Sequence, residues 1–76
     1  MRLDECVQGD RVVIKKIYGE GNFKKRLLEM GFMSGIEVEI IKYAPLKDPV
    51  ELEIKGFRIS LRVEESTKIE VGKIED

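Results

Sequence analysis

The sequence contains no histidine and a single cysteine, Cys6, and these two shortages exclude most sites at which a protein performs chemistry. Zinc sites are built from clustered Cys and His side chains, so a dedicated zinc site is not expected. The serines Ser34, Ser60 and Ser66 have no histidine that could activate them as nucleophiles. One cysteine cannot form an internal disulfide, which favours a reducing cytoplasm over secretion for a chain of this size.

Several other features are missing as well. No run approaches the roughly 20 apolar residues of a membrane span, and the opening MRLDECVQGD lacks the apolar core of a signal peptide. Gly19-Glu20-Gly21 lacks the third glycine of a dinucleotide-binding motif, so it predicts a turn. The acidic residues are scattered and lack the spacing of a calcium loop. We therefore expect no catalytic residue, no cofactor, no metal ligand set and no direct insertion into a membrane.

The balance of charge limits the partners further. The chain carries 14 basic and 15 acidic side chains, for a formal net charge of −1. A general nucleic-acid binder needs a clear basic excess to displace counterions, and this chain has none. Its 76 residues, 42% hydrophobic and 38% charged, predict one globular domain covering 1–76 with a small core.

Alternating apolar and polar residues predict a mainly β domain with several short strands. We expect strands at 11–17, 37–43, 51–55, 57–63 and 69–71, followed by a polar tail at 72–76. In the first strand, Val12 and Ile14 are expected on one face, and Val13 and Ile17 on the other. The doubled Ile40-Ile41 predicts a bulge or bend, and Lys55-Gly56 a two-residue hairpin. Five short strands around one small core favour a partly open barrel.

The same pattern leaves room for one short inserted α-helix at 23–30. Phe23, Leu27 and Met30 recur at i, i+4 and i+7, and Leu28 widens this apolar stripe. Asn22 is expected to cap the start of the helix, and Gly31 to end it in a left-handed conformation.

Two shorter segments complete the expected architecture. Leu3 and Val7 predict one helical turn that covers the core near the start of the chain. Residues 64–67 predict a short turn, with one turn of 3₁₀ helix as an option.

One local rule is broken in the predicted helix. Lys24, Lys25 and Arg26 lie in its first turn, where cations are unfavourable because they face the positive end of the helix dipole. Such violations are enriched at functional sites, so this basic turn is a candidate surface for docking on an acidic partner. Met30 and Met33 are candidate apolar contacts in the same surface. The alternative is an ordinary solvated face with the methionines in the core.

Several short motifs, taken together and in this order, resemble the FeoA family of small cytoplasmic proteins that accompany the ferrous iron transporter FeoB. The motifs are Leu3…Val7-x-Gly9, Arg26-Leu27-Leu28-x-x-Gly31, the turn closing at Gly35, Ala44-Pro45-Leu46-x-Asp48-Pro49, the Gly56 hairpin, Leu61-Arg62 and Ile69-x-Val71. The resemblance implies an SH3-like barrel with an inserted helix, related to the C-terminal module of iron-dependent repressors. It also implies a non-enzymatic, accessory role in iron transport through contact with FeoB, on the cytoplasmic side of the membrane.

Three other hypotheses remain open at this point. A small-barrel RNA-binding module would use Lys15, Lys16, Lys24, Lys25 and Arg26, if these residues cluster. A metal-sensing repressor module, or the transition-metal-ion binding associated with the family, would need ligands that the sequence does not supply as a cluster. Finally, an open barrel edge could pair weakly with a second copy of the chain.

Overall fold

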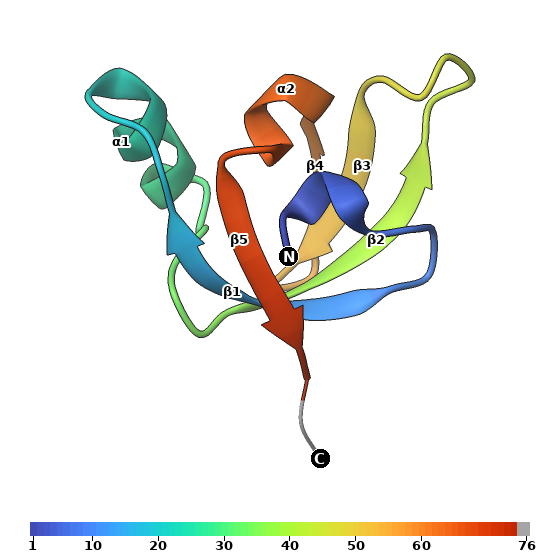
Figure 1. The fold of residues 1–76 in the computed structure, drawn as a ribbon, viewed down its shortest axis with the longest axis horizontal. Helices are drawn as coiled ribbons and strands as arrows, with labels where there is room; N and C mark the ends of the chain where they lie inside the picture. Colours follow the sequence, from blue (N-terminus) through green and yellow to red (C-terminus); the bar gives the residue numbers. More distant parts are fainter. Residues whose placement is uncertain (75–76) are drawn as a thin grey trace.

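The computed structural model describes residues 1–74 and places five strands in one bent antiparallel sheet (Figure 1). The strands are β1 (Arg11–Ile17), β2 (Glu37–Tyr43), β3 (Val50–Ile54), β4 (Phe57–Leu61) and β5 (Ile69–Lys73). The helical segments are η1 (Leu3–Glu5), α1 (Asn22–Glu29) and α2 (Val63–Ser66). The strand order is β4-β3-β2-β1-β5, so the sheet stays open between β4 and β5. This confirms the mainly β architecture with one inserted helix.

Both β1 and β2 carry a one-residue irregularity that bends the sheet. The predicted doubling in β2 is confirmed, because its register against β3 shifts between Ile40 and Lys42. A second shift in β1, between Ile14 and Lys16, was not predicted. It turns Ile17 to the same side as Val12 and Ile14, and all three are buried. The expectation that Ile17 faces away from them was therefore wrong, since alternation restarts after a bulge.

The hairpin between β3 and β4 is confirmed, with both turn residues in the left-handed region. Lys55 has φ 52° and Gly56 has φ 84°, as a two-residue hairpin turn requires. The fourth strand ends at Leu61, two residues earlier than expected, and Val63 instead begins α2. The Val63 backbone N–H donates a hydrogen bond to Asp48 Oδ1 at 3.1 Å. The last strand extends to Lys73, into the predicted tail, and residues 75–76 of that tail lie outside the described residues.

Helix α1 ends as predicted but begins differently. Its N-cap is Gly21, at φ 61°, and Asn22 is the first helical residue. At the other end Gly31 has φ 100°. The Phe32 N–H bonds to the Leu27 carbonyl at 2.9 Å, and the Gly31 N–H to the Leu28 carbonyl at 3.0 Å. This is the Schellman pattern, in which the residue after the glycine packs back on the helix.

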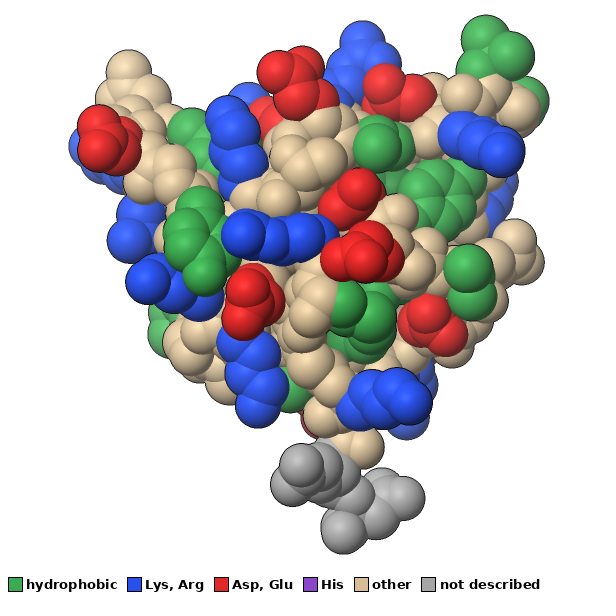
Figure 2. All heavy atoms as spheres, viewed as in Figure 1, with side chains coloured by type: hydrophobic (Ala, Val, Ile, Leu, Met, Phe, Trp, Pro, Cys, Tyr) green, Lys and Arg blue, Asp and Glu red, His purple; other side chains and the backbone are tan. Residues whose placement is uncertain are grey.

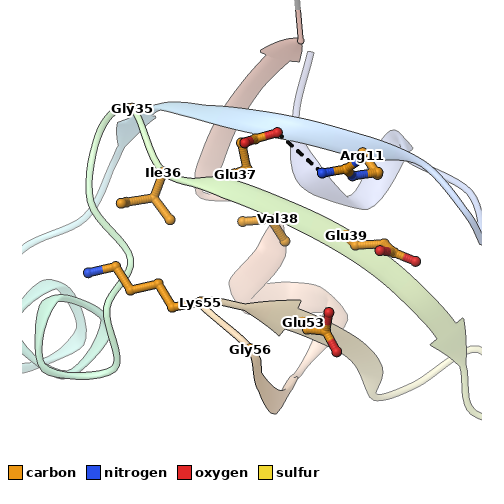
Figure 3. A pocket seen from close by; sticks show the side chains of 9 residues that line it. All are labelled: Arg11, Gly35, Ile36, Glu37, Val38, Glu39, Glu53, Lys55 and Gly56. Carbon is orange, nitrogen blue, oxygen red and sulfur yellow. Dashed lines mark ion pairs between the residues drawn. The ribbon is translucent and has the colours of Figure 1, made fainter.

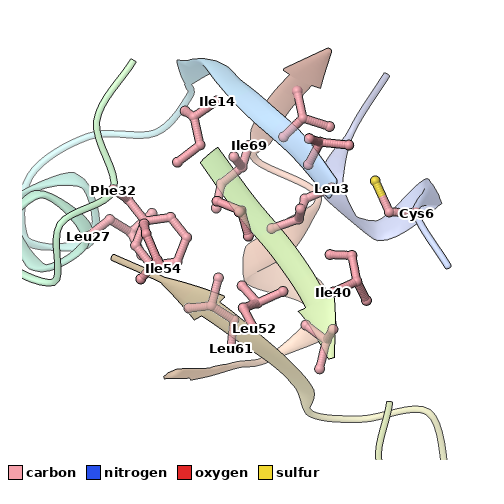
Figure 4. Close-up of a cluster of buried hydrophobic side chains, with 14 of the residues drawn as sticks. Leu3, Cys6, Ile14, Leu27, Phe32, Ile40, Leu52, Ile54, Leu61 and Ile69 are labelled. Carbon is pink, nitrogen blue, oxygen red and sulfur yellow. The ribbon is translucent and has the colours of Figure 1, made fainter. Parts of the chain in front are cut away.

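The core lies on the concave side of the bent sheet, where Leu27 and Phe32 meet side chains from the strands (Figure 4). Phe32 is the largest fully buried side chain in the described part of the molecule. The buried core residues are Leu3, Cys6, Val12, Ile14, Ile17, Leu27, Phe32, Val38, Ile40, Val50, Leu52, Ile54, Leu61, Ile69 and Val71. Helix α1 contributes only Leu27 to this set, and Phe23 and Met30 pack against it while staying partly exposed.

The N-terminal segment covers the β5 edge of the sheet. Arg2 pairs with Glu70 as an isolated bridge, and the Val71 N–H bonds to the Met1 carbonyl at 2.8 Å. Leu3 is buried, as predicted for a turn that covers the core, but Val7 is exposed. The short 3₁₀ turn ends at Glu5, before Val7 could come round to the face of Leu3.

Candidate interaction surface

The predicted basic turn lies on the exposed side of α1, and its three cations differ in what they contact. Lys24, Lys25 and Arg26 are all exposed. Arg26 forms an ion pair with Glu65 of α2, which bridges the two helices. Within residues 1–74, Lys24 and Lys25 form no ion pair with an acidic side chain. These two lysines are therefore the part of the basic turn that remains available to a partner.

A shallow cavity of about 300 Å³ lies between α1 and α2, next to this basic turn. Its walls are Asn22, Phe23, Arg26 and Glu65. Phe23 is partly buried against the core, and the Lys68 ammonium lies 4.7 Å from the centre of its ring. The Arg26–Glu65 pair and the Phe23–Lys68 contact hold the start of α1 against the end of α2.

The apolar residues near the end of α1 divide into packed and exposed members. Met30 packs against the core and is only partly exposed, whereas the side chain of Met33 is 45% exposed. Leu28 is 47% exposed, so the expectation that it widens the buried stripe was wrong. It follows Leu27 by 100° around the helix, which is enough to carry it into solvent. We call Lys24, Lys25, Leu28 and Met33 the α1 surface.

A second cavity, of about 370 Å³, lies over β2 and the β3–β4 hairpin (Figure 3). Arg11 Nη2 lies 3.5 Å from Glu37 Oε1 at its wall, and Lys55 lies at its other side. Charges of both signs line it, and Glu53 Oε1 lies 3.8 Å from Arg58 Nε. In residues 1–74 there is no group of three or more Cys, Asp or Glu side chains arranged to hold a metal ion.

A third cavity, of about 410 Å³, lies between η1 and the end of β2 and exposes Tyr43 and Val7. The Tyr43 hydroxyl donates a hydrogen bond to the Cys6 carbonyl at 2.7 Å. Burial, and then the charges of Asp10 and Glu5, raise the pKa of the Cys6 thiol. Burial also raises the pKa of Tyr43. Because a reactive cysteine needs a lowered pKa, Cys6 behaves as a packed apolar side chain.

Three surface residues could not be identified from local sequence patterns. Glu65 is 39 positions from Arg26, and no local pattern connects the two. Leu46 and Phe57 are highly exposed, although their sequence patterns predict only an ordinary loop and an ordinary strand. The loop motif that contains Leu46 was visible in the sequence, but its projection into solvent was not.

The family described as FeoA domain matches residues 1–73 of the chain. A curated relative from Porphyromonas gingivalis, the Fe(2+) transport protein A/Fe(2+) transporter FeoB fusion protein, is 48% identical over 74 residues. That match covers 97% of this chain but only 9% of the relative's length. The helices in residues 1–74 are all too short and too polar to serve as a membrane span.

Solved structures share the fold across nearly the whole chain. Iron(II) transport protein A from Clostridium thermocellum superposes with a TM-score of 0.92 at 38% identity, covering 97% of this chain and 46% of that one. FeoA from Stenotrophomonas maltophilia, described as a prokaryotic SH3 domain protein complexed with zinc, gives 0.82 at 25% identity, covering 95% and 89%. A manganese-dependent transcriptional repressor shares the fold alone, with 0.88 at 13% identity over 97% of this chain and 41% of that one. The expected SH3-like fold and its relation to repressors are thereby confirmed.

Proposed function

The chain belongs to the FeoA family, and from this membership we propose that it assists ferrous iron uptake by binding a FeoB-like transporter. The family assignment makes it an accessory of ferrous iron transport. The proposal adds the contact itself, places it on the cytoplasmic side of the membrane, and assigns it to the soluble GTP-binding domain of the transporter.

The fusion protein of Porphyromonas gingivalis is the observation that carries this proposal. In that relative, the region similar to this chain and the transporter form one polypeptide. A covalent link holds two modules at a high effective concentration, so it supports a contact between them. In a separate chain, the same contact has to be built from surface complementarity alone.

The proposed contact is made by the α1 surface. Its two lysines lack acidic partners among the described residues. Leu28 follows Lys24 by four positions on the same helical face, and Leu28 and Met33 both expose apolar area. Two of the five contact residues predicted from the sequence, Arg26 and Met30, have a supporting role in this proposal. Arg26 holds α1 to α2 through Glu65, and Met30 packs the end of the helix on the core. The expected partner surface is acidic around an apolar centre.

The chemistry of transport is assigned to the partner in this proposal. The chain contributes shape and charge, while the transporter handles Fe²⁺ and GTP. This division agrees with the lack of histidine in the sequence, and with the separation of the acidic side chains over the described part of the surface.

Titration calorimetry of the purified chain against the transporter's soluble GTP-binding domain, with and without guanine nucleotide, tests the proposal. We expect saturable binding that weakens as salt rises. The double variant K24E/K25E should weaken it about tenfold, because reversed exposed charges each contribute modestly. Lys73→Glu is the matched control, since it reverses an exposed lysine at the end of β5 away from α1. No binding to either the isolated domain or the intact transporter would refute the proposal.

The RNA-binding hypothesis stays a prediction with weaker support. Lys15 and Lys16 lie on β1, Lys16 lies 5.0 Å from the Tyr18 ring, and Arg26 is paired with Glu65. The five cations therefore do not form one free cluster. A mobility shift on RNA at physiological salt would decide the matter, and tight binding would favour this alternative.

A further inference from the structure

Leu46 is the most exposed large hydrophobic side chain of the described protein, at 91% exposure. It lies in the loop of residues 44–49 between β2 and β3, which projects from the body of the molecule at the upper right of Figure 1. Single exposed leucines are common on protein surfaces, so exposure alone says little about Leu46. What distinguishes this residue is the support beneath it and the cavity beside it.

The loop that carries Leu46 is braced at several points. The Lys47 N–H bonds to the Ala44 carbonyl at 2.6 Å, and the Ala44 N–H bonds to the Pro49 carbonyl at 3.0 Å. Asp48 Oδ1 accepts the Val63 N–H at 3.1 Å and lies 3.8 Å from Arg62 Nη1. These bonds fix the loop to itself and to the start of α2. A contact made by Leu46 would therefore lose little conformational entropy.

The cavity of about 410 Å³ opens directly beside this loop, with Lys47 at its edge. Its apolar wall consists of Cys6, Val7, Tyr43 and Val63, and its acidic rim of Asp4 and Glu5. Figure 2 shows hydrophobic side chains gathered on this face, with acidic side chains next to them. Apolar cavities of about 150 Å³ already hold a guest the size of benzene, so this one has room for a leucine side chain.

Acidic side chains on and near the rim act on the groups inside the cavity. After burial, the charges of Asp10 and Glu5 are the next causes that raise the pKa of Cys6, with Asp4 adding to them. Burial first, then Cys6, and after them Asp4 and Asp10 raise the pKa of Tyr43. A cation brought to the rim would meet favourable charge. The loop carries such a cation, Lys47, next to Leu46.

We propose that this face binds a second copy of the chain, with Leu46 of each copy inserted into the cavity of the other. A protruding apolar side chain and an apolar cavity lie side by side on one surface, as do a lysine and an acidic rim. Across a two-fold axis, Leu46 of each copy meets the cavity of the other, and Lys47 of each copy meets the acidic rim of the other. This is the self-complementarity that an isologous dimer requires. Leu46 does not fill the cavity of its own chain, because its side chain is almost wholly in solvent.

This dimer stands apart from the proposed transporter contact, because its test uses the purified chain alone. Sedimentation equilibrium should show a mass that rises with concentration from 8.8 kDa toward twice that value. Leu46→Ser should raise the dimer dissociation constant at least about tenfold, because each dimer buries two Leu46 side chains and the variant removes both. Phe57→Ser is the matched control, because Phe57 is 71% exposed at the opposite end of the β3–β4 pair and should leave the constant unchanged.

A charge exchange makes the test specific to this geometry. Lys47→Glu and Asp4→Lys should each weaken the dimer about three- to tenfold, because each places like charges across both halves of the contact. An equimolar mixture of the two variants should recover the wild-type affinity, since each chain then meets opposite charge. A strictly monomeric wild type up to about 1 mM, a dimer unaffected by Leu46→Ser, or a mixture no tighter than its components would overturn the proposal.

Discussion

Replacing Leu27 by alanine should show how much the burial of this one side chain contributes to holding α1 on the core. The same replacement at the exposed Leu28, one position away, serves as the comparison. Leu27 is fully buried at 0% exposure and is the only buried side chain of the helix, whereas Leu28 is 47% exposed. Both lie in the same helical turn, so Leu→Ala changes the intrinsic helix propensity equally at the two positions. The two variants therefore differ in burial alone.

The expected cost follows from the packing. Truncating a fully buried leucine removes its transfer free energy and leaves a cavity, which together cost about 2–5 kcal/mol. A domain of this size has a total free energy of unfolding of roughly 4–11 kcal/mol. Leu27→Ala should therefore remove a large fraction of the stability, while Leu28→Ala should change it by less than about 0.5 kcal/mol. Because α1 has no other fully buried side chain, we expect part of the loss as local opening of the helix.

Urea unfolding followed by circular dichroism measures the global cost, and amide hydrogen exchange measures the local one. In Leu27→Ala, amides of α1 should lose protection before those of β2 and β3, which meet at the centre of the sheet. Leu28→Ala provides the control for both measurements. Two variants whose free energies of unfolding differ by less than about 1 kcal/mol would refute the packing argument.

Two further predictions concern charged and titratable groups. Because burial and nearby acids raise the pKa of Cys6 above its ordinary 9.0, the folded chain keeps the thiol proton at pH values where the unfolded chain has lost it. This contribution to the free energy of unfolding is fully present below pH 9.0 and is lost as pH rises further. Urea unfolding at increasing pH should therefore show a smaller alkaline loss of stability for Cys6→Ala than for the wild type. Glu65→Ala should destabilise the fold by about 1.5 kcal/mol and Arg26→Ala by about 0.5 kcal/mol. The difference is expected because Glu65 also accepts the Arg62 N–H at 3.0 Å at the start of α2. If thermal unfolding showed the same loss of stability for both variants, this capping role of Glu65 would be contradicted.

Regular periodicity accounts for the parts of the fold that could be predicted. The apolar alternation in β2 and the glycine after α1 gave the strand, its bulge and the helix end in their observed places. The bulge in β1 left no such trace, because Lys15 and Lys16 suit either face of a half-exposed strand. The N-cap at Gly21 was missed for a similar reason, since Asn22 is the better capping residue by side-chain chemistry.

The candidate surfaces were predictable only in part. The unfavourable cations at the start of α1 were visible as a broken local rule, and Lys24 and Lys25 are exposed. The division between Met30, which packs, and Met33, which does not, required the position of the core. The Leu46 loop and the cavity beside it join segments from both ends of the chain, and no spacing in the sequence brings Val7 near Val63.

The sequence by itself determined that this is a small β domain with one main helix, that it has no histidine and no internal disulfide, and that it resembles the FeoA family. These properties follow from composition, short-range periodicity and local turn requirements. Only the tertiary structure decided which apolar side chains remain in solvent, which cations are paired, and which cavity lies beside the Leu46 loop. Those outcomes depend on contacts between residues far apart in the chain, and local pattern carries no information about them.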